Sequence, residues 1–72
     1  MLKINERIKE IRVKNNFTQK QMAEILKVNE ASMQKFEYGT LRPSLDTLII
    51  IAEYFNISLD YIIGLSDIKE RR

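Results

Sequence analysis

The fold of this chain is decided by residues 18–38, which read TQKQMAEILKVNEASMQKFEY. Two short amphipathic helical patterns lie in this stretch, and only Lys27, Val28 and Asn29 separate them. Three residues are too few to return one helix antiparallel along the other, so the two helices are expected to cross at a steep angle. The stretch therefore predicts a helix-turn-helix.

Polar residues mark the ends of these two helices. Thr18 with Gln21 three residues later fits a capping box, and Asn29 is suited to cap the next helix. The first helix is expected to end near Lys27, and the second to run to about Tyr38, before Gly39. The residues expected to be buried are Met22, Ala23, Leu26, Met33 and Phe36.

Three more helical patterns flank this pair. The sequence predicts helices over about residues 5–15 with Asn5 as the cap, from Ser44 to about Phe55, and from Ser58 to Gly64. Their inward residues are expected to be Ile4, Ile8 and Ile11, then Leu45, Leu48, Ile51, Ala52 and Phe55, then Leu59 and Ile62. The sequence predicts an all-α domain of five helices over residues 1–65, with residues 66–72 as a short flexible C-terminal tail.

Composition excludes several classes of site. The 72 residues include no cysteine and no histidine, which excludes disulfides, His/Cys metal sites and catalytic systems built on those residues. No metal, cofactor or small-molecule effector is expected. No apolar run approaches the ~18 residues of a membrane span, and no secretory signal is visible, so a soluble cytoplasmic protein is expected.

Charge is unevenly distributed along the chain. Residues 1–42 carry nine basic and five acidic side chains, whereas residues 43–68 carry four acidic and no basic ones. Two surfaces with different partners are therefore expected, although short chains can be uneven by chance.

Taken in order, these features resemble the lambda-repressor/Cro-like (XRE-type) helix-turn-helix family. The matching residues are Thr18-Gln19, Met22-Ala23, Leu26, Val28-Asn29, Met33, Phe36-Glu37, Gly39, Arg42-Pro43-Ser44-Leu45, Leu48, Ala52, Phe55 and Ile57-Ser58-Leu59-Asp60. The resemblance covers about residues 7–65. It implies a compact five-helix domain that binds double-stranded DNA.

The resemblance also implies roles by position. Base-reading positions would be Glu30, Ala31, Ser32, Gln34 and Lys35. Phosphate-binding positions would be Gln19, Lys20, Tyr38, Thr40 and Arg42. At Glu30 two interpretations remain open, since a carboxylate can accept from cytosine N4 or favour the positive end of a helix dipole. Gln19 and Arg42 could likewise be ordinary solvated residues.

The resemblance further implies an ion pair between Arg12 and Glu37, which would hold the third helix against the first. The chain departs from the family at Asn16 and Lys27, where glycine is usual, so some backbone strain is expected in these turns.

A second surface is expected on the last two helices. Ile50, Tyr54, Tyr61 and Ile63 are apolar residues outside the expected inward set, in a region without Lys or Arg. They predict a homodimer interface, which would present two recognition helices to a near-palindromic DNA site. The alternative is that some of these residues complete the small core.

The sequence thus favours a DNA-binding transcriptional regulator that acts as a dimeric repressor. The alternative is a helical protein-interaction module, such as the antitoxin of a toxin–antitoxin pair. An enzyme is not expected, because no Gly-rich phosphate loop and no catalytic pair accompanies the carboxylates.

Overall fold

The computed structural model describes residues 3–66 and 68–70. The helices in these ranges are α1 (Ile4–Lys14), α2 (Gln19–Leu26), α3 (Glu30–Tyr38), α4 (Leu45–Phe55) and α5 (Leu59–Ile63). The only strand-like pairing in these two ranges is one isolated antiparallel bridge between Ile57 and Glu70. The prediction of five helices in an all-α domain is confirmed. Within the same ranges, no helix has the length and apolar character needed to cross a membrane.

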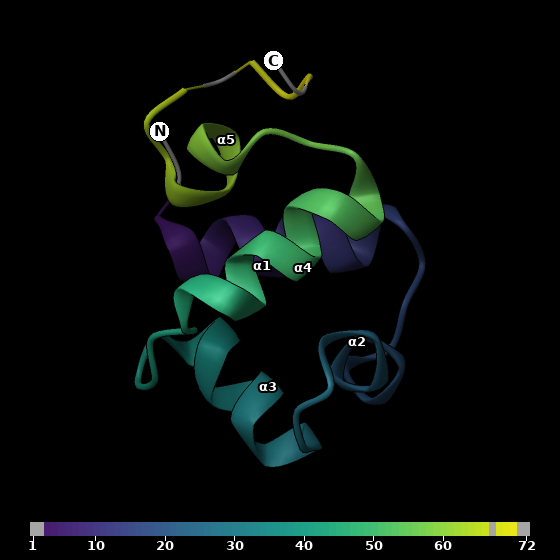
Figure 1. The fold of residues 1–72 in the computed structure, drawn as a ribbon. Coiled ribbons are helices and arrows are strands. Elements are labelled where there is room, and N and C mark those ends of the chain that lie inside the picture. Colours follow the sequence, from purple (N-terminus) through teal and green to yellow (C-terminus); the bar gives the residue numbers. More distant parts are fainter. Residues whose placement is uncertain (1–2, 67, 71–72) are drawn as a thin grey trace.

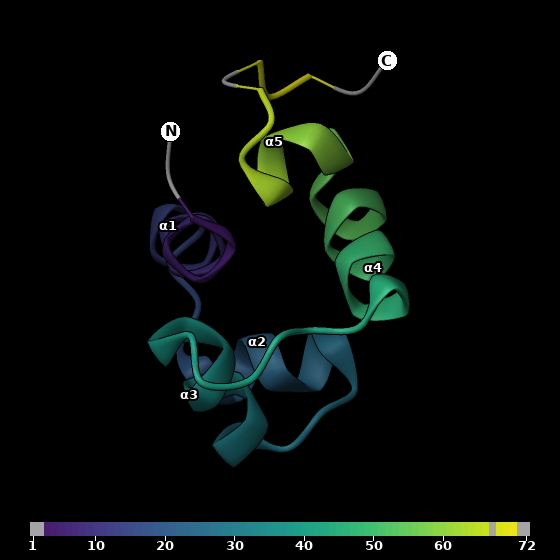
Figure 2. The same ribbon diagram turned by 90° about the vertical axis from the view of Figure 1, so that its left-hand side faces the viewer.

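The helices enclose a single interior. In Figure 2, α2 and α3 form one end of the molecule, α5 forms the other, and α1 and α4 lie between them on opposite sides. Figure 1 shows the same arrangement from the side of α4, with α1 behind it. The packing partners agree with this view, since α3 contacts α1 and α2, and α5 contacts α1 and α4.

Side-chain caps begin four of the helices as the sequence predicts. The Thr18 hydroxyl accepts a hydrogen bond from the Gln21 amide at 3.0 Å, and the Gln21 side chain accepts from the Thr18 amide at 2.8 Å. Asn29, Ser44 and Ser58 cap the next three helices. Each such cap satisfies a backbone donor that the helix itself leaves unpaired.

The start of α1 differs from the prediction. Asn5 is not its cap, because the helix begins at Ile4 and the cap position is Lys3, two residues before Asn5. The Glu6 carboxylate accepts from the Lys3 amide at 2.9 Å. Asn5 lies inside the first turn, and its side-chain amide donates to the backbone carbonyl of Glu37 at 3.4 Å. Asn5, which the sequence predicts as the cap of its own helix, thus contacts α3 instead.

Residues in the left-handed conformation lie at or just after the ends of several helices. Asn16 and Lys27 both have φ of 60°, a conformation that costs side chains other than glycine roughly 1 kcal/mol. The expected backbone strain at these two turn positions is therefore present. Gly39, with φ of 85°, ends α3 without that cost.

The core is built from one apolar face of each helix and from Ile57, between α4 and α5. Its fully buried side chains are Ile8, Met22, Leu26, Met33, Ile51, Ile57 and Ile62. One inward prediction is wrong, because Leu45 is 62% exposed while Thr47 is buried. At about 100° per residue, Thr47 lies about 40° from the fully buried Ile51 around the helix, whereas Leu45 lies about 120° away.

The described part of residues 66–72 runs beside the start of α5. The Ser58 amide donates to the Lys69 carbonyl at 2.9 Å, and the Ser58 hydroxyl donates to the Ile68 carbonyl at 3.1 Å. Residues 67, 71 and 72 lie outside the described ranges, and the flexibility of the tail stays a prediction.

Candidate nucleic-acid interface

The turn between α2 and α3 has the tight geometry that the sequence predicts. Lys27 ends α2 in the left-handed conformation, and its amide donates to the Glu24 carbonyl at 3.2 Å. The next amide, of Val28, reaches back to Ala23 at 3.0 Å, and Asn29 then caps α3. Val28 packs against the core beneath the turn. Helices α2 and α3 therefore form the predicted helix-turn-helix.

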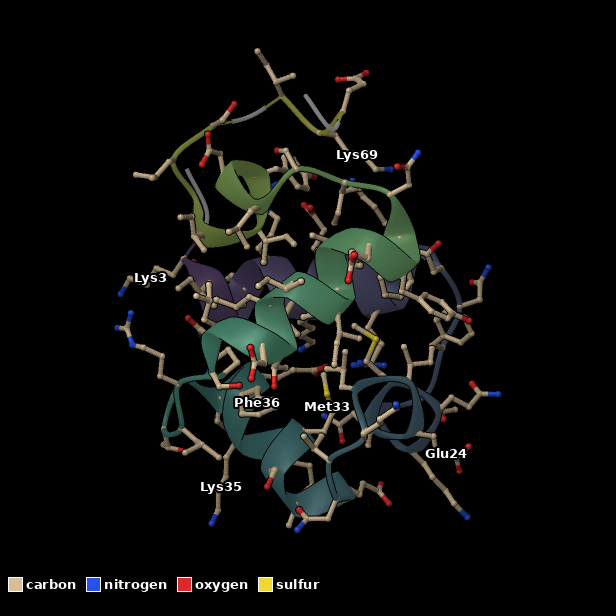
Figure 3. All side chains as sticks on the ribbon, in the orientation of Figure 1. Lys3, Glu24, Met33, Lys35, Phe36 and Lys69 are labelled. Carbon is tan, nitrogen blue, oxygen red and sulfur yellow. The ribbon has the colours of Figure 1, made fainter. Side chains whose placement is uncertain are left out.

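Helix α3 has one narrow buried stripe and one wide polar face. Met33 is fully buried and Phe36 is 5% exposed. Both point from α3 into the interior in Figure 3, whereas Lys35 points away from the protein. Of the five predicted base-reading residues, Ser32 is half-buried and the exposed ones are Glu30, Ala31, Gln34 and Lys35. These four exposed side chains make the outer side of α3 accessible to a polar ligand.

The Glu37 carboxylate holds α3 against both α1 and α2. Arg12 donates from Nε to Oε2 at 2.6 Å and from Nη2 to Oε1 at 3.0 Å, and Gln19 donates from Nε2 to the same Oε1 at 3.1 Å. The Glu37 side chain is only 5% exposed, and the Arg12 side chain is 14% exposed. A carboxylate this buried needs such donors to offset its lost hydration. The structure thus brings together the predicted pair of Arg12 and Glu37 and adds Gln19 to it.

The predicted phosphate-binding residues surround the outer face of α3. Lys20, Thr40 and Arg42 are exposed, and Gln19 is half-buried because of its bond to Glu37. Tyr38 is 83% exposed at the last position of α3. The loop that carries Thr40 folds back onto α3, where the amides of Thr40 and Leu41 donate to the Lys35 carbonyl at 3.1 and 3.3 Å.

Two shallow concavities lie beside α3 and meet at Tyr38. The first, of about 440 Å³, is lined by Lys9, Arg12, Gln19, Gln34, Glu37 and Tyr38. The second, of about 370 Å³, is lined by residues that include Lys3, Asn5, Tyr38, Gly39 and Arg42. Helix α1 and the residue before it therefore add Lys3 and Lys9 to the surface around α3.

The sequence interpretation did not include Lys3 and Lys9 in the site. A signal for Lys9 was present, because Asn5, Lys9 and Arg12 fall at i, i+4 and i+7, which is one stripe of a helix. Once Arg12 is paired with Glu37, the other two members of that stripe are expected to face α3 as well.

The predicted dimer residues do not form one exposed patch. Tyr54 is 57% exposed, but Ile50 and Ile63 are partly buried against the core, and Tyr61 is only 7% exposed. The expectation of an exposed Tyr61 is therefore wrong. Helix α5 has five residues, too few for the apolar pattern to show whether Tyr61 faces inward or outward.

Tyr61 instead belongs to a polar cluster between α5 and α1. Its hydroxyl donates to Glu10 Oε1 at 2.8 Å, and the Arg7 guanidinium stacks on its ring at 3.8 Å. Arg7 also contacts Glu10 at 3.0 Å. The hydrogen bond from Tyr61 lowers the pKa of Glu10 below its ordinary value, and Arg7 and Lys14 act in the same direction. Burial, together with the bond to Glu10, raises the pKa of Tyr61.

Comparison with known protein families gives one match that spans most of this architecture. The sequence profile described as helix-turn-helix matches residues 8–62, a range that contains α2, the turn, α3, α4 and most of α1 and α5.

Individual proteins are similar over nearly the whole chain. The HTH-type transcriptional regulator ImmR of Bacillus subtilis is 30% identical over 97% of this chain and 55% of its own length. The cryptic phage CTXphi transcriptional repressor RstR of Vibrio cholerae is 36% identical over 88% of this chain and 56% of its own. The chain thus spans about half the length of these curated relatives.

One solved structure shows the same fold at lower identity. The P22 c2 repressor protein, crystallised in complex with a synthetic operator, superimposes with a TM-score of 0.81 at 20% identity. The superposition covers 92% of this chain and all of the P22 chain.

Proposed function

The chain belongs to the lambda-repressor-like helix-turn-helix family of DNA-binding transcriptional regulators, and we propose that it represses transcription as a dimer bound to a near-palindromic operator. In this proposal α3 lies in the major groove and reads base edges with Gln34, Lys35, Ala31 and Glu30. The cytoplasm is the proposed place of action, and the proposed activity is DNA binding rather than catalysis.

The observation that carries this proposal is the exposed polar face of α3, which the Glu37 contacts hold rigidly to the rest of the fold. A recognition helix must present several side chains to base edges at once, so its position relative to the scaffold has to be defined. Arg12 and Gln19 reach Glu37 from two different segments and provide that definition. Lys35, one turn before the end of α3, points outward where a base edge or a phosphate would lie (Figure 3).

Residues on both sides of α3 support binding to the DNA backbone. Arg42 and Thr40 are exposed in the loop after α3, and Lys20 is exposed in the first turn of α2. Contacts of this type position a protein on DNA without reading its sequence, and basic contacts make the affinity fall with salt. The first turn of α2 also has backbone N–H groups that favour an anion near Gln19.

The dimer proposal rests on the apolar side chains that are exposed on α4. Tyr54 is the most exposed of the predicted interface residues, and Leu45 and Ile49 are exposed on the same helix, at 62% and 39%. Apolar exposure on this scale is compatible with a protein contact. Two copies related by a two-fold axis would place two α3 helices about 34 Å apart, one turn of DNA.

Two similar proteins support repression rather than activation of transcription. RstR is named a transcriptional repressor, and the P22 c2 repressor shares the fold and was solved with an operator. A protein that occupies a promoter in this way can exclude the transcription machinery.

Selection of bound duplexes from a random DNA pool tests the whole proposal. The expected result is a near-palindromic motif whose half-sites are one helical turn apart. Enrichment of a single unrepeated half-site would contradict the dimer, and no enrichment at low salt would contradict DNA binding. The proposed repression is tested by placing the selected motif across a reporter promoter, where expression of the protein should lower the reporter signal.

A further inference from the structure

The concavity between α1, α2 and α3 has one side chain whose role the helix-turn-helix does not explain. Lys9 lines this space of about 440 Å³ together with Arg12, Gln19, Gln34, Glu37 and Tyr38. Its neighbours Arg12 and Gln19 are both bonded to Glu37. Among the ion pairs of the described residues, none involves Lys9.

The orientation of α1 explains why Lys9 faces this space. Asn5 and Arg12, one turn before and about one turn after Lys9, both bond to Glu37, through its carbonyl and its carboxylate respectively. Lys9 lies between them on the same stripe, and that stripe faces α3. Because the Glu37 carboxylate is already satisfied, the exposed Lys9 ammonium remains available at the rim of the concavity.

The floor of the concavity does not repel an anion. Glu37 is the acidic residue among the lining side chains, and the two hydrogen bonds from Arg12 neutralise its charge. Since a carboxylate can only accept, the Gln19 side chain must turn its amide nitrogen toward Glu37. One of its two N–H groups is used there, and the second remains for a ligand.

We propose that Lys9 of α1 is a further phosphate contact, and that it supplies the cationic side of this concavity for the DNA backbone phosphate already proposed at Gln19, whose side chain Glu37 orients. This inference rests on the proposed function and extends it, because α1 then takes part in DNA binding. A phosphate in this position lies beside Gln34, one of the outward residues of α3. The contact would therefore fix the register of α3 in the groove without reading a base.

The test compares Lys9→Gln with Lys14→Gln in the full chain. Both variants remove one positive charge from α1, but Lys14 lies 3.9 Å from Glu10 and lines a different concavity with Phe55 and Tyr61. Binding to a fluorescent mixed-sequence duplex and to the selected operator is measured over a range of salt concentrations. Thermal unfolding followed by circular dichroism establishes that each variant is folded.

For Lys9→Gln we expect affinity to fall roughly five- to tenfold near 0.1 M salt on both duplexes, with the slope of log K against log salt reduced by about 0.9. Lys14→Gln should keep the wild-type slope, and Lys9→Arg should restore it. The preferred sequence should be the same in all these variants.

Three results would overturn the inference. Equal slopes for Lys9→Gln and Lys14→Gln would show that Lys9 contacts no phosphate. A changed sequence preference with an unchanged slope would assign Lys9 to a base edge instead. If the wild-type protein itself shows no salt-dependent binding, the proposed function fails, and the phosphate contact fails with it.

Discussion

The carboxylate of Glu37 and the side chain of Arg12 are joined by two hydrogen bonds, at 2.6 and 3.0 Å, across the boundary between α3 and α1. The third guanidinium nitrogen of Arg12 donates to the Phe17 carbonyl at 2.9 Å, in the segment that leads into α2. One arginine therefore ties together both helices of the helix-turn-helix and the helix that precedes them.

Arg12→Ala should destabilise the fold far more than Glu6→Ala. Removal of Arg12 leaves the buried Glu37 carboxylate with Gln19 as its remaining side-chain donor, and breaking a buried pair in this way costs about 3 kcal/mol. Glu6 accepts one hydrogen bond at the exposed start of α1, worth about 1 kcal/mol. Urea unfolding of both variants provides the measurement. Equal unfolding midpoints would show that the ion pair contributes no more than a helix cap.

Arg42→Gln should weaken binding to all DNA sequences about equally. Arg42 is exposed in the loop beside α3, where it would contact a phosphate, so its loss should lower the salt slope by about one. Lys69→Gln is the matched control, because Lys69 lies at the opposite end of the molecule from Lys35 (Figure 3). Fluorescence anisotropy over a salt series measures both. An unchanged slope for Arg42→Gln would leave Arg42 a solvated loop residue.

Substitution of Lys35 should alter sequence preference rather than stability. Lys35→Ala removes an exposed side chain from the outer face of α3, so the free energy of unfolding should change by less than about 0.5 kcal/mol. At the base pair that Lys35 contacts, discrimination should fall by about 1–3 kcal/mol. Repeating the DNA selection with the variant reveals which position of the motif becomes degenerate. If every position is retained while affinity falls, Lys35 contacts a phosphate.

The Glu10–Tyr61 contact should make stability depend on pH at both extremes. The pKa of Glu10 is lowered in the folded protein, so its contribution is present above the ordinary value of 4.5 and is lost as the pH falls through the folded value. The pKa of Tyr61 is raised, so its contribution is present below the ordinary value of 10.0 and is lost as the pH rises through the folded value.

Tyr61→Phe tests this dependence because it keeps the ring that stacks on Arg7 and removes only the hydroxyl. The variant should be less stable near pH 7 and should lose less of its stability at either extreme. Tyr54→Phe is the control, since the Tyr54 side chain is 57% exposed. Urea midpoints from pH 3 to 11 give the comparison. Identical pH profiles for wild type and Tyr61→Phe would contradict the assigned contact.

A change at Tyr54 should separate dimer formation from folding. Tyr54→Lys adds a charge to the exposed face of α4 and should shift the protein toward monomer in sedimentation equilibrium at micromolar concentration. Tyr38→Lys introduces the same change at an even more exposed tyrosine, on α3, and should leave self-association unaltered. A wild-type protein that is monomeric with and without its selected DNA site would refute the dimer.

The sequence by itself determined the elements of this fold that depend on neighbouring residues. Caps at Thr18, Asn29, Ser44 and Ser58, and the left-handed stop at Gly39, need only a few consecutive residues, and the structure contains all five. The apolar stripe of α3 was also predictable, because Met33 and Phe36 are its only large apolar residues before the exposed Tyr38. Short-range hydrogen bonding and helical periodicity are sufficient causes for these features.

Only the tertiary structure decided which surfaces these helices share. It placed Tyr61 on Glu10, fifty-one residues away in the chain, and it buried Thr47 where an inward Leu45 was predicted. It also brought Lys9 to the side of α3 and used Gln19 to satisfy Glu37. Periodicity gives the angle of a residue around its own helix but not the position of the neighbouring helices, and the packing of all five helices sets that position.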